Sequence, residues 1–146
     1  MVVGSLCSRP AVSVPTGAPV VEVARLMQDR HVGAVVVTEG RADRLRPAGI
    51  ITDRDIVSAQ LARTADLSRL AAGDIMTRNP LVLGEEEPVD GAISHLRARG
   101  VRRAPVVSRD GRLVGLVSAD DLFAHLAREL VAMGEIIARQ RRIERG

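Results

Sequence analysis

Apolar residues recur every three or four positions in two stretches that lie 69 residues apart. This spacing places the apolar side chains on one face of a helix, and the proline before each stretch suits a first helical turn. The sequence therefore predicts two equivalent amphipathic helices, one in each half of the chain. Their apolar positions are Val20, Val23, Ala24 and Met27 in the first half and Val89, Ala92, Ile93 and Leu96 in the second.

Each predicted helix is followed by an apolar, β-branched run, HVGAVVV at 31–37 and GVRRAPV at 100–106. Such runs are typical of strands, and Pro105, which has no N–H to donate, indicates an edge or a strand end. A second short strand follows in each half, GII at 49–51 and GLV at 115–117, and runs directly into another helix. The order strand, helix, strand, strand, helix is therefore expected twice.

The two repeats differ in the loop between their last two strands. Residues 39–48 form this loop in the first repeat and residues 108–114 in the second, a difference that a hairpin loop absorbs. One unit of this size cannot cover both faces of its own sheet. We therefore expect an α+β fold in which two β-α-β-β-α repeats pack about a pseudo-twofold axis and leave clefts between them. The expected boundaries are 1–70 for the first repeat, 71–128 for the second and 129–146 for a C-terminal helical extension.

Helical spacing continues well past the second repeat. From Ala119 onward it is carried by Leu122, Leu126, Leu130, Met133 and Ile137, which predicts one long amphipathic helix. Its last stretch, 138–146, is basic, which suits the negative end of a helix dipole, and we interpret it as a solvated tail. An exposed apolar stripe favours association, so we expect a homodimer that uses this helix.

The composition sets limits on compartment and chemistry. The 146 residues suffice for one compact unit. There is no apolar run of about 18 residues and no secretory signal pattern, so we expect a cytoplasmic protein without a membrane span. Cys7 is the single cysteine, and the three histidines lack ligand-like spacing, so we expect neither a disulfide nor a structural metal site. We expect His95 and His125 to be exposed on helices and His31 to lie at a helix end.

Charge and motifs narrow the function classes. The formal net charge of +3 favours anionic partners only weakly. The chain has no Trp or Tyr and one Phe, so the base-stacking surfaces of single-strand binders are missing and nucleic-acid binding is not expected. It also lacks a phosphate-binding loop, a nucleophile elbow and a metalloprotease motif, which argues against an enzyme.

The stretches GIITDRD and GLVSADD share one pattern: a glycine, a hydroxyl residue three places on and an aspartate three places after that. One interpretation is a helix start, with Thr52 or Ser118 as the cap and Asp55 or Asp121 closing a capping box. A second interpretation adds a ligand, because helix N-termini bind phosphate and a carboxylate accepts hydrogen bonds from ribose hydroxyls. The repetition at equivalent points of a duplication favours both together.

With these motifs in place, the chain resembles a tandem CBS domain pair, a family named after cystathionine beta-synthase. The resemblance covers nearly the whole chain and rests on AGIITDRDI at 48–56, DIMTRNPLVL at 74–83, VRRAPVV at 101–107 and GRLVGLVSADDL at 111–122. It implies a regulatory module that binds AMP, ADP, ATP, S-adenosylmethionine or an NAD-type dinucleotide in the clefts between its lobes. It implies no required cofactor, and modules of this kind commonly pair into flat discs.

The resemblance assigns roles to the two helix starts. It implies that Asp55 and Asp121 hold ribose hydroxyls, while Thr52 and Ser118 lie near the ribose and the phosphate. Thr77, in the segment before the second repeat, is a further contact by the same resemblance. Without a ligand, Thr77 is a linker cap and the hydroxyl residues are helix caps only.

Further implied contacts concern the adenine and the phosphate. The adenine is expected to lie against Val12 and Leu81, which are otherwise core residues. Arg102 and Arg103 match positions that touch phosphate in some family members, and a solvated strand end is the alternative interpretation, which ranks slightly lower. The first repeat has a glycine and an alanine at the matching positions, with Arg54 as its nearby source of positive charge. We therefore expect unequal sites.

The favoured hypothesis is a cytoplasmic CBS pair without catalytic activity that senses an adenosine ligand and signals to an unidentified protein effector. The alternative keeps the same fold as a structural dimerisation scaffold with empty clefts. Direct nucleic-acid binding through the arginine-rich tail ranks last, because no groove or stacking surface accompanies it.

Overall fold

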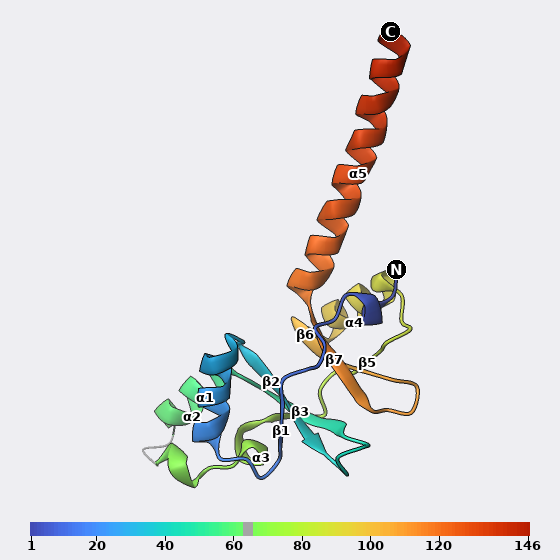
Figure 1. The fold of residues 1–146 in the computed structure, drawn as a ribbon. Coiled ribbons are helices and arrows are strands. Elements are labelled where there is room, and N and C mark those ends of the chain that lie inside the picture. Colours follow the sequence, from blue (N-terminus) through green and yellow to red (C-terminus); the bar gives the residue numbers. More distant parts are fainter. Residues whose placement is uncertain (63–65) are drawn as a thin grey trace.

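The computed structural model describes residues 1–62 and 66–146. Each half folds in the predicted order of strand, helix, strand, strand, helix (Figure 1). The first repeat comprises β1 (Ser13–Pro15), α1 (Val20–Arg30), β2 (Ala34–Glu39), β3 (Arg46–Thr52) and α2 (Asp53–Ala62). The second comprises β5 (Leu83–Gly84), α4 (Val89–Arg99), β6 (Arg103–Val107), β7 (Leu113–Ser118) and α5 (Ala119–Arg145). The predicted α+β duplication is confirmed.

Short elements precede each repeat and connect the two. A 3-10 turn, η1 (Val3–Ser5), begins the chain, and a second, η2 (Leu67–Arg69), is followed by the one-turn helix α3 (Ala72–Ile75) and the two-residue strand β4 (Thr77–Arg78). The first sheet has the order β1-β2-β3-β4 and the second the order β5-β6-β7. In both sheets the first pair is parallel and the second is antiparallel. Within the described residues, no helix is both long and apolar enough to cross a membrane.

The expected edge or strand-end position of Pro105 is wrong, because this proline lies in the middle of β6, the central strand of the second sheet. Strand β5 pairs with β6 only at Val106 and Val107, so the missing N–H falls just before that pairing begins. In the first repeat the equivalent residue, Val36, donates its N–H to the carbonyl of Val12 at 3.0 Å. The second repeat lacks this hydrogen bond, because Pro105 has no N–H.

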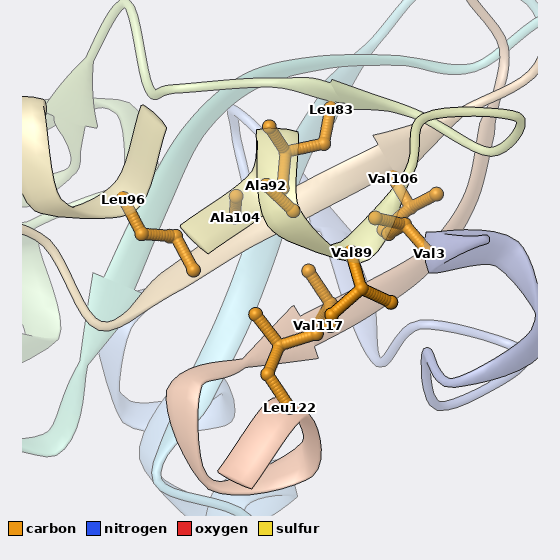
Figure 2. Close-up of a cluster of buried hydrophobic side chains, with 9 residues drawn as sticks. All are labelled: Val3, Leu83, Val89, Ala92, Leu96, Ala104, Val106, Val117 and Leu122. Atoms are coloured by element: carbon orange, nitrogen blue, oxygen red, sulfur yellow. The ribbon is translucent and has the colours of Figure 1, made fainter. Parts of the chain in front are cut away.

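The two hydrophobic cores are aliphatic. Each core also contains a residue from the chain segment that precedes the other repeat. Val3, at the start of the chain, is fully buried in the core of the second repeat (Figure 2). Ala72, in α3, is fully buried in the core of the first. Backbone hydrogen bonds fix both crossings, from Val3 N to Glu87 O at 2.9 Å and from Ala72 N to Ala18 O at 2.7 Å. The two repeats are therefore interleaved.

The same crossings explain the glycine that begins the repeated stretches GIITDRD and GLVSADD. In the first sheet β4 pairs with β3 opposite Gly49, and in the second the chain near Ser8 bridges to Leu116 beside Gly115. A Cβ on Gly49 would lie 2.8 Å from the carbonyl oxygen of Thr77, and one on Gly115 would lie 2.7 Å from that of Ser8. Both positions need glycine because a backbone crosses directly over them.

The predicted long C-terminal helix is confirmed, since α5 contains 27 residues, and its C-terminal part projects away from both lobes (Figure 1). The expectation for His125 is wrong: its side chain is buried, because it lies one turn after the core residue Leu122 on the face of α5 that packs on the lobe. His95 is exposed, and His31 ends α1, as expected.

We predict that Gly115→Ala lowers the free energy of unfolding by about 1–3 kcal/mol, because the new methyl group overlaps a backbone oxygen that cannot move without breaking the strand bridge. Urea denaturation followed by circular dichroism measures this loss. The control is Gly134→Ala in the exposed part of α5, where no atom lies within 4 Å of the added Cβ. Alanine should leave stability there unchanged or raise it. Equal stability of the two variants would contradict the crowding at Gly115.

Candidate functional site

Both predicted helix starts are capping boxes with the same geometry. At the start of α2 the N–H of Thr52 donates to Oδ2 of Asp55 at 2.8 Å, and the N–H of Asp55 donates to Oγ1 of Thr52 at 3.2 Å. At the start of α5 the N–H of Ser118 donates to Oδ2 of Asp121 at 2.8 Å, and the return bond from Asp121 N to Ser118 Oγ is 3.2 Å. The helix-start interpretation of the motif is confirmed.

The capping box also decides where each carboxylate points. Backbone donation to a single oxygen, Oδ2, holds the Asp121 carboxylate beside the end of β7, where the hydroxyl of Ser118 also donates to it at 2.8 Å. The first helical turn presents N–H groups and a partial positive charge at this place. Asp55 is held in the same way at the end of β3.

A cavity of about 200 Å³ opens at the second helix start, between the two repeats. Arg103, Ser118 and Asp121 line it from the second repeat, together with Leu116 of β7. The wall from the first repeat is formed by the chain before β1 and by the start of β2, and consists of Ser8, Pro10, Ala11, Val12, Val32, Gly33 and Ala34. The structure thus brings four of the predicted site residues together, namely Val12, Arg103, Ser118 and Asp121.

Arg103 is the cation of this cleft. It is the first residue of β6, pairs with Ser118 on β7 and is half-buried. Its Nη2 atom lies 3.6 Å from the position that a Cβ of Gly33 would occupy, so the guanidinium reaches across to the first repeat. A larger residue at position 33 would crowd this arginine.

Arg102 lies outside the cavity although it is the neighbour of Arg103 in the chain. Successive strand residues point to opposite faces, and Arg102 forms an exposed ion pair with Asp120, with Nη2 and Oδ1 3.1 Å apart. The structure therefore separates the two arginines that the sequence pattern groups together.

Of the remaining predicted residues, Thr77 and Arg54 lie near the first helix start and Leu81 belongs to the second repeat. Thr77 lies in β4 opposite Ile50, two positions before Thr52, and is exposed. Leu81 is half-buried and packs against the core of the second repeat. Arg54 is exposed in the first turn of α2, where its N–H donates to Asp53 at 2.8 Å.

Three residues of the cleft are not predicted as site residues from the sequence: Ser8 is not predicted at all, and Gly33 and Ala34 are noted only as positions that lack arginine. All three line the cavity. Their positions can be found by the alignment of the two halves, because a shift of 69 residues places Ser8 on Thr77. That signal does not show that the second helix start faces residues of the first repeat.

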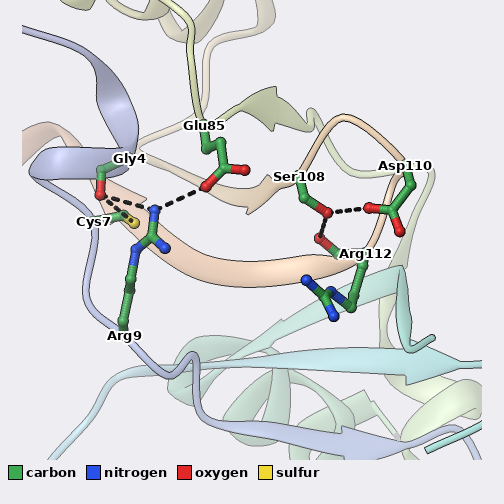
Figure 3. Close-up of polar contacts among 7 residues, drawn as sticks. All are labelled: Gly4, Cys7, Arg9, Glu85, Ser108, Asp110 and Arg112. Atoms are coloured by element: carbon green, nitrogen blue, oxygen red, sulfur yellow. Dashed lines mark hydrogen bonds and ion pairs between the residues drawn. The ribbon is translucent and has the colours of Figure 1, made fainter. Parts of the chain in front are cut away.

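The segment that leads to the cleft is fastened to the second lobe by Arg9 (Figure 3). Its guanidinium donates to Gly4 O at 3.0 Å and to the Glu85 carboxylate at 3.2 Å. The Cys7 side chain and then the Glu85 carboxylate raise the pKa of Arg9. In the neighbouring hairpin the hydroxyl of Ser108 donates to Asp110 and lowers the pKa of that carboxyl group.

Two interleaved β-α-β-β-α repeats, each with a capped helix start at the end of its last strand, define a paired module. The CBS domain family matches the chain twice, at residues 3–62 and 72–128, and the chain belongs to this family. A curated relative, hypoxic response protein 1 of Mycobacterium tuberculosis, is 32% identical over 108 residues, which cover 74% of this chain and 73% of that protein.

Other relatives are longer. An uncharacterized protein of Methanopyrus kandleri is 29% identical over 82% of this chain and 60% of its own length. Inosine-5'-monophosphate dehydrogenase of Korarchaeum cryptofilum is 32% identical over 82% of this chain, but the match spans only 23% of the enzyme. The chain thus corresponds to one part of each of these proteins.

Solved structures of CBS proteins share the fold. A CBS domain protein from Pyrobaculum aerophilum complexed with AMP is 31% identical with a TM-score of 0.74, covering 88% of this chain and 99% of that one. A CBS domain pair in complex with 5'-methylthioadenosine and S-adenosyl-L-methionine is 25% identical with a TM-score of 0.76, covering 88% and 98%. Hypoxic response protein 1, with two coordinated zinc ions, has a TM-score of 0.73 at 28% identity, covering 86% and 98%. Within residues 1–62 and 66–146 of the present chain, no group of three or more His, Cys, Asp or Glu residues is arranged to hold a metal ion.

Proposed function

We propose that the chain is a regulatory module that binds an adenosine-containing ligand in the cleft at the start of α5. The observation that carries this proposal is the joint lining of one cavity by a capped carboxylate, a guanidinium and apolar strand residues, drawn from both repeats. A ligand that contacts both repeats at once changes how they sit against each other, which is what a sensor requires.

Each part of an adenosine monophosphate has a matching group in the cleft. The Asp121 carboxylate accepts hydrogen bonds from vicinal ribose hydroxyls. The N-terminus of α5 and the Arg103 guanidinium provide donors and positive charge for a phosphate, while the Ser118 hydroxyl holds the Asp121 carboxylate in place. Val12 and Leu116 supply an apolar wall for the adenine, with polar readout left to backbone groups. Ser8 adds a hydroxyl at the mouth of the cleft.

The similar structures support this ligand class. AMP, 5'-methylthioadenosine and S-adenosylmethionine, which are bound in two of them, all contain adenosine. They differ in charge, so the single cation Arg103 is the residue in this cleft that would favour a phosphate over a neutral thioether.

We propose a second, weaker site at the start of α2, formed by Thr52, Asp55, Thr77 and Leu81, with Arg54 nearby. Its capping box has the same geometry as that of the first site. The position equivalent to Arg103 is Ala34, so this site lacks a cation of its own strand. Arg102 is left out of both sites because it is paired with Asp120.

The module is proposed to act in the cytoplasm as a homodimer without catalytic activity of its own, passing the ligand signal to a separate protein effector. The second candidate is a structural scaffold of the same fold with unoccupied clefts. The capping boxes support this scaffold, because helix capping alone accounts for the presence of Thr52 and Ser118. The following experiments separate the two.

In a thermal-shift assay with AMP, ATP, S-adenosylmethionine and NADH, at least one of these ligands should raise the melting temperature of the protein. A ligand at a hundredfold excess over its Kd stabilises the folded state by about 2.7 kcal/mol. Guanosine monophosphate is the control for adenine recognition. An unchanged melting temperature across the whole panel would support the scaffold instead.

Arg103→Gln should raise the Kd of AMP about tenfold to a hundredfold, because a hydrogen bond to a charged group contributes about 1.5–3 kcal/mol. It should leave the affinity for adenosine, which has no phosphate, nearly unchanged. Arg102→Gln is the matched control: it removes the neighbouring guanidinium, which lies outside the cleft. Isothermal titration calorimetry measures both affinities, and equal losses in the two variants would refute the placement of the phosphate at Arg103.

Asp121→Ala should remove most of the AMP binding heat, and Asp55→Ala should remove less, because only the first of these carboxylates shares a cavity with Arg103. Both substitutions break a capping box and cost a similar stability of about 1 kcal/mol. Circular dichroism melts therefore serve as the folding control for calorimetry. The reverse order of the two losses would show that the start of α2 is the principal site.

A further inference from the structure

The exposed apolar side chains of α5 form one continuous stripe. When the helix is divided into heptads lettered a to g, with Phe123 at position a, these side chains occupy positions a, d and g of three consecutive heptads. The stripe consists of Phe123, Leu126, Leu130, Met133, Ile136, Ile137 and Ile143. Val131, which is also exposed, is the large apolar residue of α5 that lies off this stripe. A stripe about 30 Å long on a helix about 10 Å wide is comparable with the largest apolar patches that monomers leave exposed.

The stripe continues into an apolar groove at the base of the helix. A cavity of about 390 Å³ lies between α4 and the first turns of α5. Ile93, Leu96 and Val101 line it from the side of α4, and Phe123 and Leu126 line it from α5. The groove and the helix therefore present a single surface.

The charges along α5 are divided between its two halves. Residues 119–132 contain one arginine and three acidic residues, of which Asp120 is paired with Arg102, whereas residues 133–145 contain two acidic residues and four arginines. A parallel pair of such helices would place the two basic ends together. An antiparallel pair places each basic half beside an acidic half and also opposes the helix dipoles.

We propose that two copies of this chain associate through α5 as an antiparallel helix pair. The heptad places Leu130 against the partner's Met133 and Leu126 against the partner's Ile137, with the twofold axis between Leu130 and Met133. The partner's Ile143 then reaches the groove between α4 and α5. Both the stripe and the groove are covered, and the C-terminal end of the helix, which projects away from both lobes (Figure 1), gains a partner.

This arrangement holds the two lobe pairs at opposite ends of a helical rod. The cleft at Ser118 and Asp121 faces the first repeat and is not covered by the stripe. The inference is independent of the ligand proposal, because its test measures association of the protein without nucleotide.

Sedimentation velocity of the full chain should show a dimer at micromolar concentrations. Leu130→Glu should convert it to a monomer, because it places two charges at the centre of the apolar seam. The matched control is Val131→Glu, since Val131 is 63% exposed and Leu130 is 70% exposed on the same helix. The control should remain a dimer, and both variants should keep the helix content of the wild type. A monomeric wild type, a dimeric Leu130→Glu variant or equal dissociation of both variants would overturn the proposal.

Disulfide trapping tests the orientation. Leu126→Cys and Ile137→Cys are made separately on a Cys7→Ala background, mixed and oxidised. The antiparallel pair gives disulfides between the two different variants, identified by mass spectrometry. A parallel pair aligns each cysteine with its own copy, so disulfides within each variant alone would refute the antiparallel arrangement.

Discussion

The structure depends on a backbone crossing that occurs once in each sheet. The segment before each repeat crosses the last strand of the other repeat. The segment before the second repeat passes Gly49 of β3, and the segment before the first passes Gly115 of β7. Only glycine leaves room for a chain at this distance. The crossings carry Val3 and Ala72 into their cores, and the crossing above Gly115 continues directly to Ser8 and Val12. The close contact that interleaves the repeats therefore also builds the wall of the cleft.

The same few hydrogen bonds serve structure and site. The capping box of Ser118 and Asp121 begins α5 and at the same time orients a carboxylate at the mouth of the cavity. The duplicated chain has two such helix starts, and they are unequal. Arg103 supplies charge to one cleft, and α5 is much longer than its counterpart α2, with 27 residues against 10. The proposed ligand cleft and the proposed association surface therefore lie on separate parts of one small module.

Much of the fold follows from local patterns. Apolar spacing in the helices, β-branched runs in the strands and the T/S-x-x-D signal at both helix starts predict the element order, and the self-alignment predicts the duplication. These features depend on neighbours within one or two turns of chain, which the sequence records directly. The errors arise where distant contacts decide. Pro105 occupies a central strand because its neighbour β5 begins one residue later, and His125 is buried because the lobe packs on that face of α5.

The sequence by itself determined the two repeats, their capped helix starts, the long apolar helix and the residue types available for an adenosine ligand. Only the tertiary structure decided which of these residues share a cavity. It turned Arg103 into the cleft and Arg102 toward Asp120, and it joined Asp121 to Gly33 and Ala34 of the other repeat. The physical reason is that strand pairing and the crossing of the repeats set the directions of these side chains, and both involve residues far apart in the chain.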